Sequence, residues 1–137
     1  MNLGFQRRTD LALGILRSLA ERGERMSGAE LAERVATTIT YLPQVVASLI
    51  QAGWVSSDRG PGGGNQLTAA AGDVRLLEVI EATEGPADDG RCALGSGPGS
   101  GEISCPIHAE WSEARQVLIE GFGQVPAVSA HSQGDQQ

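Results

Sequence analysis

The chain of 137 residues is poor in aromatic side chains and contains no lysine at all. With aromatic content at 4%, a core has to come from Leu, Val, Ile and Ala, and 40% hydrophobic residues are enough for one compact domain. No apolar run approaches the ~18 residues of a membrane span, and the N-terminus lacks the apolar segment of a secretory signal. We therefore expect a cytoplasmic protein that makes no membrane contact.

Motifs of the common enzyme classes are also missing from the sequence. There is no serine-hydrolase elbow, no Walker A loop and no dinucleotide-binding fingerprint. The glycine run at 60–64 follows a strand-like segment without opening a helix, so it is unsuited to holding a phosphate as a P-loop does. These absences argue against an enzyme.

The net charge of −7 is unevenly distributed along the chain. Residues 1–60 carry a net charge of +1, and residues 61–137 carry −8. The first half therefore permits nucleic-acid binding without arguing for it. The net charge of −7 favours an alternative, a protein-interaction module that has lost DNA binding. All basic residues are Arg, which suits bidentate contacts with phosphate or guanine.

Three helices are expected in the first half of the chain. Apolar residues recur at helical spacing over 8–22, where Gly23 supplies the stop. Ser27 and Glu30 form a capping-box pattern that opens a second helix to about residue 35. A third helix is expected over 40–52, with Leu42, Val45, Val46, Leu49 and Ile50 facing inward. Two short helices joined by a tight turn are typical of a helix-turn-helix.

A glycine-rich run, Arg59-Gly60-Pro61-Gly62-Gly63-Gly64, lies between two short strand-like segments, 54–57 and 65–68. Glycines permit positive φ and a close approach of the backbone to another surface. Directly after a helix-turn-helix, this pattern indicates the wing of a winged helix, with Arg59 reaching a DNA groove or phosphate. The alternative is a plain β-hairpin turn with an exposed Arg.

The second half contains two further helices, at about 74–82 and 106–122, separated by a loop rich in Gly, Pro and Ser over 86–104. Ala114, Leu118 and Phe122 form an apolar stripe on the last helix, with Trp111 and Val117 beside it. Such a stripe is expected to form a dimer or to fold back on its own domain. Residues 124–137 are polar and are expected to be disordered.

Both cysteines are associated with the long loop: Cys92 lies inside it and Cys105 ends it, with His108 following three residues later. A polar loop is the wrong place for cysteines acting as buried hydrophobes, and a cytoplasmic location disfavours a disulfide. Metal ligation, redox sensing and the absence of any role remain open. Cysteine and histidine near the start of one helix suit an iron–sulfur cluster or zinc.

Taken together, these segments resemble the IscR/NsrR-like group of Rrf-type winged-helix transcriptional regulators, over residues 1 to about 123. The segments that match are Tyr41-Leu42 with Gln44, Gly53 to Ser57, Arg59 to Gly64, Arg91-Cys92, and Cys105-Pro106-Ile107-His108-Ala109-Glu110-Trp111. The resemblance implies a mainly α fold with a small β-hairpin wing: a winged helix-turn-helix plus a long C-terminal dimerisation helix. It divides the chain into a DNA-binding domain (1–85), a cluster-binding loop (86–105), a dimerisation helix (106–123) and a disordered tail (124–137).

The same resemblance implies a homodimeric regulator, a repressor in our interpretation, that binds a palindromic site in double-stranded promoter DNA. Its promoter binding would be controlled by an iron–sulfur cluster responding to redox or nitrosative stress. The residues expected to contact DNA are Thr40, Tyr41, Gln44, Ser57, Arg59, Gly60, Pro61, Gly62 and Gly63.

The cysteine loop of this family normally holds three cysteines, and the middle one follows a Gly-Pro pair. Here Gly99 occupies that position. The resemblance offers two other ligands: His108, and Asp10 from the first helix of the partner subunit. Cys92, Cys105, His108 and a partner Asp10 make four ligands, which favours a 2Fe–2S over a 4Fe–4S cluster. Because of Gly99 the alternative is a cluster-free regulator, constitutive or switched by the thiols of Cys92 and Cys105.

Overall fold

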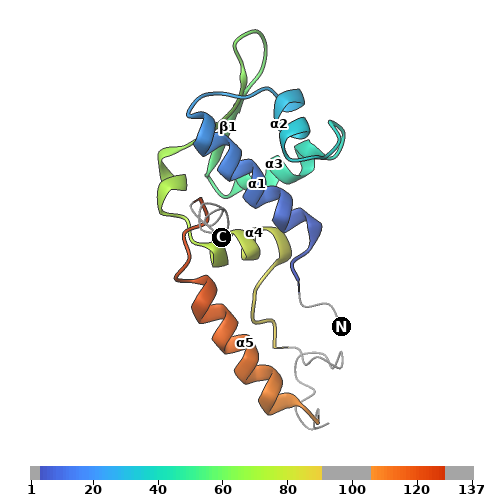
Figure 1. Ribbon diagram of the computed structural model, residues 1–137, viewed down its shortest axis with the longest axis vertical. Helices are drawn as coiled ribbons and strands as arrows, with labels where there is room; N and C mark the ends of the chain where they lie inside the picture. The colour runs from blue at the N-terminus through green and yellow to red at the C-terminus, as the bar shows by residue number, and fades with distance from the viewer. Residues whose placement is uncertain (1–3, 91–105, 129–137) are drawn as a thin grey trace, which may run out of the picture.

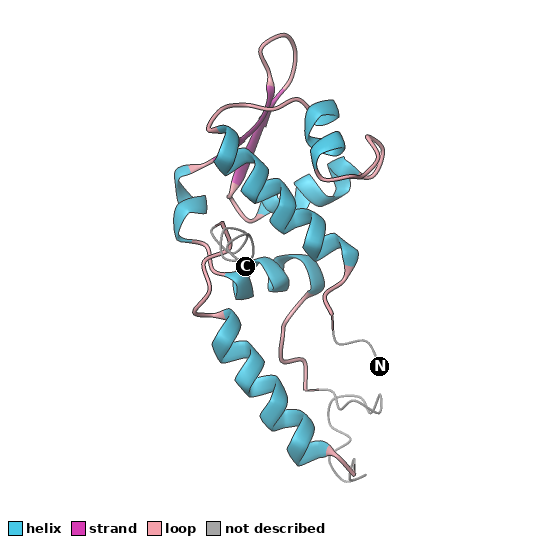
Figure 2. Ribbon diagram, in the orientation of Figure 1, coloured by secondary structure: helices cyan, strands magenta, loops and turns pink. Residues whose placement is uncertain are grey.

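The computed structural model describes residues 4–90 and 106–128. Its elements are α1 (Arg7–Arg22), α2 (Gly28–Arg34), α3 (Leu42–Gln51), β1 (Val55–Asp58), β2 (Gly64–Leu67), the 3₁₀ helix η1 (Ala69–Asp73), α4 (Leu76–Glu84) and α5 (His108–Phe122). Helices dominate, and β1 and β2 form the only sheet in the described part of the chain (Figure 2). The expected fold, mainly helical with a winged hairpin and a C-terminal helix, is confirmed.

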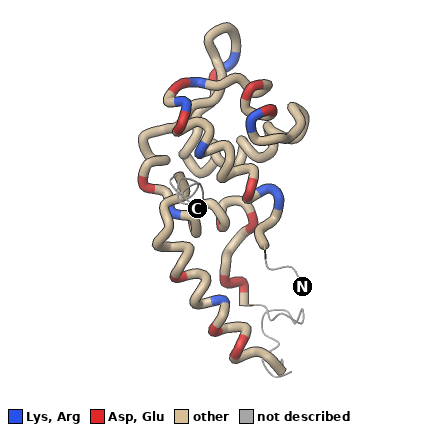
Figure 3. Tube along the Cα trace, in the orientation of Figure 1, with Lys and Arg blue, Asp and Glu red and all other residues tan. Residues whose placement is uncertain are grey.

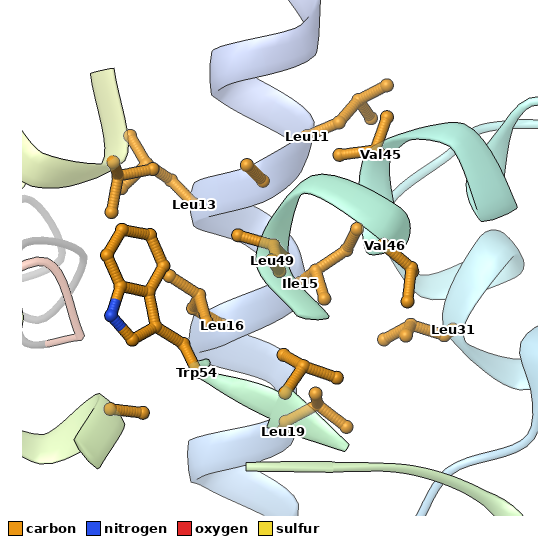
Figure 4. Close-up of a cluster of buried hydrophobic side chains, with 14 of the residues drawn as sticks. Leu11, Leu13, Ile15, Leu16, Leu19, Leu31, Val45, Val46, Leu49 and Trp54 are labelled. Carbon is orange, nitrogen blue, oxygen red and sulfur yellow. The ribbon is translucent and has the colours of Figure 1, made fainter. Parts of the chain in front are cut away.

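The core forms where α1 crosses the other elements of the body (Figure 1). Ile15 and Leu16 of α1 and Leu49 of α3 are fully buried, and Trp54 closes one side of the cluster beside Leu16 (Figure 4). Few of these side chains are aromatic, as the composition predicts. Burying apolar surface of this kind is the main term that holds α1 and α3 together.

Ile50 is a correction to the expected inner face of α3. Its side chain is 42% exposed, whereas Leu49 is 0% exposed. At 100° per residue Ile50 lies about 80° around the helix from Leu42, at the edge of the apolar stripe. It lines the groove between α3 and the hairpin instead of the core.

Ser27 caps α2 as expected, but the Glu30 carboxylate accepts from the Ser27 hydroxyl instead of from the Ser27 backbone N–H that a full capping box requires. The Ser27 hydroxyl accepts a hydrogen bond from the backbone N–H of Glu30 at 3.1 Å, and Ser27 Oγ also lies 3.2 Å from the Glu30 carboxylate. After α2 the chain turns through Ala36, a non-glycine residue with a φ of 58°. The Thr38 hydroxyl then accepts from the backbone N–H of Tyr41 at 3.0 Å, immediately before α3. Local side-chain bonds thus fix the start of α2 and the entry to α3.

The hairpin β1–β2 is antiparallel, with Val55 opposite Leu67 and Asp58 opposite Gly64. It docks on the helices through Asn65, which exchanges backbone hydrogen bonds of 3.0 and 2.8 Å with Met26. Gly64 adopts a φ of 135°, and a Cβ at this position would approach the Met26 carbonyl oxygen to 2.7 Å. A glycine is therefore required where the wing meets the turn before α2.

The segment after α5 returns to the body, which corrects part of the expected disordered tail. Leu76 donates its backbone N–H to Val125 at 2.7 Å, and Ala127 donates to Val74 at 2.9 Å. Ala127 is fully buried. Residues 125–127 have few polar side chains and pair with the start of α4, so they gain backbone bonds and burial that a solvated tail lacks. Residues 129–137 lie outside the described part.

Helix α5 extends away from the body, and its N-terminal end is remote from α1–α4 (Figure 1). None of its residues is buried, and Val117 and Leu118 of the expected apolar stripe are 64% and 50% exposed. At the end nearer the body, Phe122 contacts Phe5 edge-to-face with ring centroids 5.3 Å apart. Within the described residues no helix is long and apolar enough to cross a membrane.

The contrast between Leu49 and Ile50 predicts different costs of truncation in the same helix. Leu49→Ala opens a cavity in the core and is expected to lower the free energy of unfolding by about 2–5 kcal/mol. Ile50→Ala removes an exposed side chain and is expected to change it by no more than about 0.5 kcal/mol. Urea unfolding at one fixed protein concentration measures both. Equal losses in the two variants would contradict the burial of α3 described above.

Candidate nucleic-acid interface

The turn before α3 and α3 itself carry no charged residue: none occurs from Val35 to Ala52. Of the residues expected to contact DNA, Thr40 and Gln44 are exposed at the start of α3. The Gln44 side chain makes no hydrogen bond within the described residues, so its amide is available to a ligand. Tyr41 is partly buried and packs against the core, which leaves its ring less available than expected.

The tip of the hairpin carries Arg59, which is exposed and makes no hydrogen bond or ion pair within the described part of the chain. The turn closes through a bond of 2.9 Å from the Gly63 N–H to the Gly60 carbonyl. Gly60 and Gly62 have φ values of 86° and 78°. These left-handed conformations form the tight loop that projects Arg59 beyond the body of the protein.

A single arginine, Arg25, fixes the hairpin to the body. Its guanidinium lies 2.7 Å from the Asp58 carboxylate at the end of β1 and donates to Gln66 of β2 at 2.9 Å. It also donates to the Gly62 carbonyl in the loop at 3.3 Å. One side chain thus contacts both strands and the turn, and the pair with Asp58 neutralises the carboxylate next to Arg59. We call these contacts the Arg25 clamp.

The hairpin and α3 line a common groove of about 440 Å³. Pro43, Ala47 and Ile50 form its helix side, and Ser57 with the glycines of the turn forms the hairpin side. Ser57 is opposite Asn65 in the hairpin, and Ser57 is exposed to solvent. The start of α3 and the base of the wing therefore border the same surface, as a winged helix that binds a duplex requires.

The four expected cluster ligands are divided between described and undescribed parts of the chain. Cys92 and Cys105 lie outside the described residues, and so does Gly99. His108 is exposed as the first residue of α5, and Asp10 is exposed in the first turn of α1. Neither side chain makes a hydrogen bond or ion pair among the described residues. The start of α5 lies far from α1 (Figure 1), so one subunit does not bring His108 and Asp10 together.

Asp10 borders a second groove, of about 470 Å³, between α1 and the end of α2. Arg7, Arg17 and Arg34 line the same groove. Arg7 donates to the Ala36 carbonyl at 3.0 Å, and Arg34 pairs with Glu21 at 2.6 Å. Because Glu21 neutralises Arg34, Arg7 and Arg17 are the cations of this groove that are not paired with a carboxylate among the described residues.

Polar contacts join the start of α1 to the end of α4, just before the cysteine loop. The hydroxyls of Thr9 and Thr83 are both buried and lie 2.8 Å apart. Thr9 also donates to the Glu84 carboxylate, which accepts the Gln6 N–H at 3.1 Å. Thr9 lies next to Asp10 in sequence, so this network fixes the turn of α1 that presents Asp10.

The first described residues of the loop are held against α5. Asp88 pairs with Arg115 at 2.7 Å and accepts the Gly90 N–H at 3.1 Å. The Gly90 hydrogen bond, followed by the Arg115 bond, lowers the pKa of the Asp88 carboxyl below its usual value. Asp88 therefore stays ionised at neutral pH, and the loop leaves α4 alongside the helix that begins with His108.

The sequence of this chain matches the Rrf2 family, described as an iron-dependent transcriptional regulator, over residues 5–126. The chain belongs to the Rrf2 family. It is therefore a member of a family of transcriptional regulators, in agreement with the resemblance carried by its motifs.

Among curated relatives, the chain is 39% identical to the HTH-type transcriptional regulator IscR of Klebsiella pneumoniae over 94 residues. This match covers 69% of the chain and 56% of the relative, so the chain spans little more than half the length of that protein.

Among solved structures, CymR, the global cysteine regulator of B. subtilis, superposes with a TM-score of 0.74 at 23% identity, covering 96% of this chain and 98% of that one. IscR of T. potens superposes with a TM-score of 0.68 at 21% identity, covering 100% and 90%. At these identities the likeness establishes the winged-helix fold.

The Arg25 clamp has no counterpart in the sequence expectations. Arg25 precedes α2, and only the docking of Asn65 on Met26 brings the hairpin beside it. From the sequence alone, a charged residue next to a helix cap is expected to have a solvated side chain. The sequence offers one indication of the clamp. Asp58 lies beside Arg59, and a wing that binds DNA has to neutralise this carboxylate.

The clamp predicts that Arg25→Ala weakens DNA binding without removing a phosphate contact. We expect a loss of about fivefold to tenfold, because the wing loses its support and Asp58 becomes an uncompensated negative charge. Arg59→Ala should also weaken binding, and it should reduce the slope of log K against log salt by about 0.9. Titrations of a selected duplex at several salt concentrations measure both.

Two further variants serve as controls for the clamp. Asp58→Ala added to Arg25→Ala should recover part of the affinity, since it removes the uncompensated carboxylate. Arg8→Ala, which removes the same charge at the start of α1, should leave binding nearly unchanged. A salt slope in Arg25→Ala reduced as in Arg59→Ala would show that Arg25 itself contacts phosphate and would contradict the clamp.

Proposed function

We propose that the protein is a homodimeric, cytoplasmic repressor that binds a palindromic promoter site and whose binding is controlled by an iron–sulfur cluster, 2Fe–2S in preference to 4Fe–4S, in response to redox or nitrosative stress. The observation that carries the DNA-reading part is the common groove bordered by α3 and the wing. Gln44 and Thr40 at the start of α3 would read the major groove, while Arg59 and the residues Gly60 to Gly63 would contact the backbone and minor groove.

The dimer is supported by α5. A 15-residue helix with no buried residue leaves Val117 and Leu118 in solvent, and apolar side chains at helical spacing are a common seam between two helices. Its body-side end is anchored by Phe122 and by the return of residues 125–127 to α4. Two copies joined along α5 would present two DNA-binding domains, the two heads of the dimer, related by a twofold axis, which matches a palindromic site.

The donor chemistry of the four candidate ligands fits an iron–sulfur cluster. Cys92 and Cys105 would supply thiolates, His108 an imidazole, and Asp10 of the partner subunit a carboxylate. Exposure of Asp10 and His108 without competing contacts supports this role. A bound 2Fe–2S cluster supplies one-electron redox chemistry, and a His ligand raises its potential relative to four cysteines.

Helix α1 would connect the cluster ligand Asp10 to the DNA-reading helix α3. Asp10 lies one residue from buried Thr9, and α1 packs against α3. A contact between Asp10 and the cysteine loop of the other subunit would fix the relative orientation of the two DNA-binding domains. Its loss would release that constraint and change the spacing of the half-sites that the dimer can bind.

The second candidate is a cluster-free regulator, constitutive or switched by the thiols of Cys92 and Cys105. Gly99 at the place of the usual middle cysteine favours it. The fold is shared with CymR, the global cysteine regulator of B. subtilis. In this reading the oxidised pair would form a disulfide and the reduced pair would not, with no metal involved.

Metal content separates the two candidates. An anaerobic preparation is expected to hold about two irons and two acid-labile sulfides per subunit, with visible bands that bleach on reduction. Asp10→Ala should lower the retained iron and abolish the redox dependence of DNA affinity, whereas Asp73→Ala, an exposed carboxylate of η1, should change neither. Negligible iron after reconstitution would leave the thiol-switched or constitutive regulator in its place.

The dimer predicts that a charge on the apolar stripe of α5 produces monomers. Leu118→Glu places a carboxylate in the proposed seam, and we expect the dissociation constant of the dimer to rise by at least about 100-fold. Gln116→Glu adds the same charge to the opposite side of α5 and serves as the control. Analytical ultracentrifugation measures both variants. A Leu118→Glu protein that remains a dimer would place the interface elsewhere.

A further inference from the structure

The absence of charge from Val35 to Ala52 restricts what α3 can recognise. In the major groove, guanine is read mainly by Arg or Lys through O6 and N7, and cytosine by Glu or Asp through its amino group. None of these side chains occurs in α3 or in the turn that leads to it. Adenine, in contrast, is read by Asn or Gln, and the thymine methyl group by apolar side chains.

The exposed side chains of this surface are of the second kind. Gln44 lies in the first turn of α3 with a free amide, and its backbone N–H is held by the Tyr41 carbonyl at 3.1 Å. Pro43 and Ala47 present apolar atoms to the groove on the wing side. Ile39, just before α3, is 65% exposed, an unusual exposure for a large apolar side chain with no covering element.

Charged residues that border this surface do not supply the missing chemistry. Asp58 is the nearest carboxylate in the groove, and Arg25 occupies it. Arg59 projects from the wing tip, where the wing of a winged helix meets the minor groove or the backbone. The start of α3 therefore meets a base edge without a charged group: it offers the Gln44 amide, the Thr40 hydroxyl, which does not discriminate between bases, and apolar groups.

We infer that each half-site is read in the major groove as A·T pairs, with Gln44 bonding an adenine through N6 and N7 and with Pro43 and Ala47 contacting thymine methyl groups. This inference rests on the proposed DNA-reading role of α3. It names the base pairs that the role requires, and it assigns Gln44 as the residue that determines specificity.

A preference for A·T could also arise from the wing, because a narrow A-tract minor groove attracts arginine. The two sources differ in the atoms they need. Adenine N7 and the thymine methyl group lie in the major groove only. Replacing adenine by 7-deazaadenine, or thymine by deoxyuridine, removes these atoms and leaves the minor-groove edge unchanged.

The first step of the test is selection of binding sites by the full chain from a random duplex library. The enriched half-site should contain A·T pairs at the positions facing α3. Single substitutions of 7-deazaadenine or deoxyuridine at those positions should each weaken binding by about tenfold, and the same substitutions in flanking positions should not. Guanine-dependent half-sites, or sites insensitive to both substitutions, would overturn the inference while leaving DNA binding intact.

The second step assigns the reading to Gln44. Gln44→Ala should abolish the effect of 7-deazaadenine at one position, and Gln44→Arg should shift the selected base there to guanine. Gln51→Ala is the matched control, since it removes the same side chain from the last turn of α3, and N-terminal residues are those that contact bases. An unchanged half-site in Gln44→Arg would contradict the assignment. No enrichment with wild-type protein would contradict the proposed function itself.

Discussion

Burial of α1 is the constraint on which the rest of the structure depends. Helices α2, α3 and α4 and strand β2 all contact α1, and its residues Ile15 and Leu16 are fully buried. A helix that packs on so many elements cannot rotate without exposing apolar surface at ~25 cal/mol for each Å². Its remaining exposed face carries Asp10, and its buried side carries Thr9 in the network with Thr83 and Glu84. A contact made at Asp10 therefore acts on a rigid body that includes α3.

The wing has almost no core of its own, so its position depends on contacts with the body of the protein. Two strands of four residues are too short to be stable alone. Asn65 and Gly64 attach the base of the hairpin to Met26 through the backbone, and the Arg25 clamp fixes its turn through side chains. Each exposed ion pair contributes little to stability. The value of the clamp lies in position and charge: it holds a flexible glycine turn in one place and neutralises the carboxylate beside Arg59.

Periodicity and caps predicted the helices to within two residues at most ends, because those signals are local. Ser27 with Glu30 is one such signal, and the apolar stripe of α1 is another. Features that depend on tertiary contacts were not predictable in this way. Ile50 has the hydrophobicity of a core residue but lies at the edge of its helix stripe, and residues 125–127 pair with α4 only because α5 returns them to it. Of the candidate site, Gln44 and Arg59 were expected from the sequence and their DNA contacts stay predictions, whereas Arg25 could be recognised only from the docked hairpin.

The distribution of charge explains how an acidic protein can serve a DNA-reading role. Acidic residues are spaced along α5 and near the end of α4, while arginines gather on α1, and α2 and the wing carry one each (Figure 3). Three of the seven arginines in residues 1–60, namely Arg22, Arg25 and Arg34, are paired with carboxylates. Because acidic residues nearly balance arginines over residues 1–60, charge alone contributes little to phosphate binding by one copy. In the proposed dimer, affinity would then come from base contacts and from linking two DNA-binding domains, since the second domain joined through α5 would act at high effective concentration. A regulator of this kind would respond strongly to any change in how its two heads are set, because that geometry supplies much of its affinity.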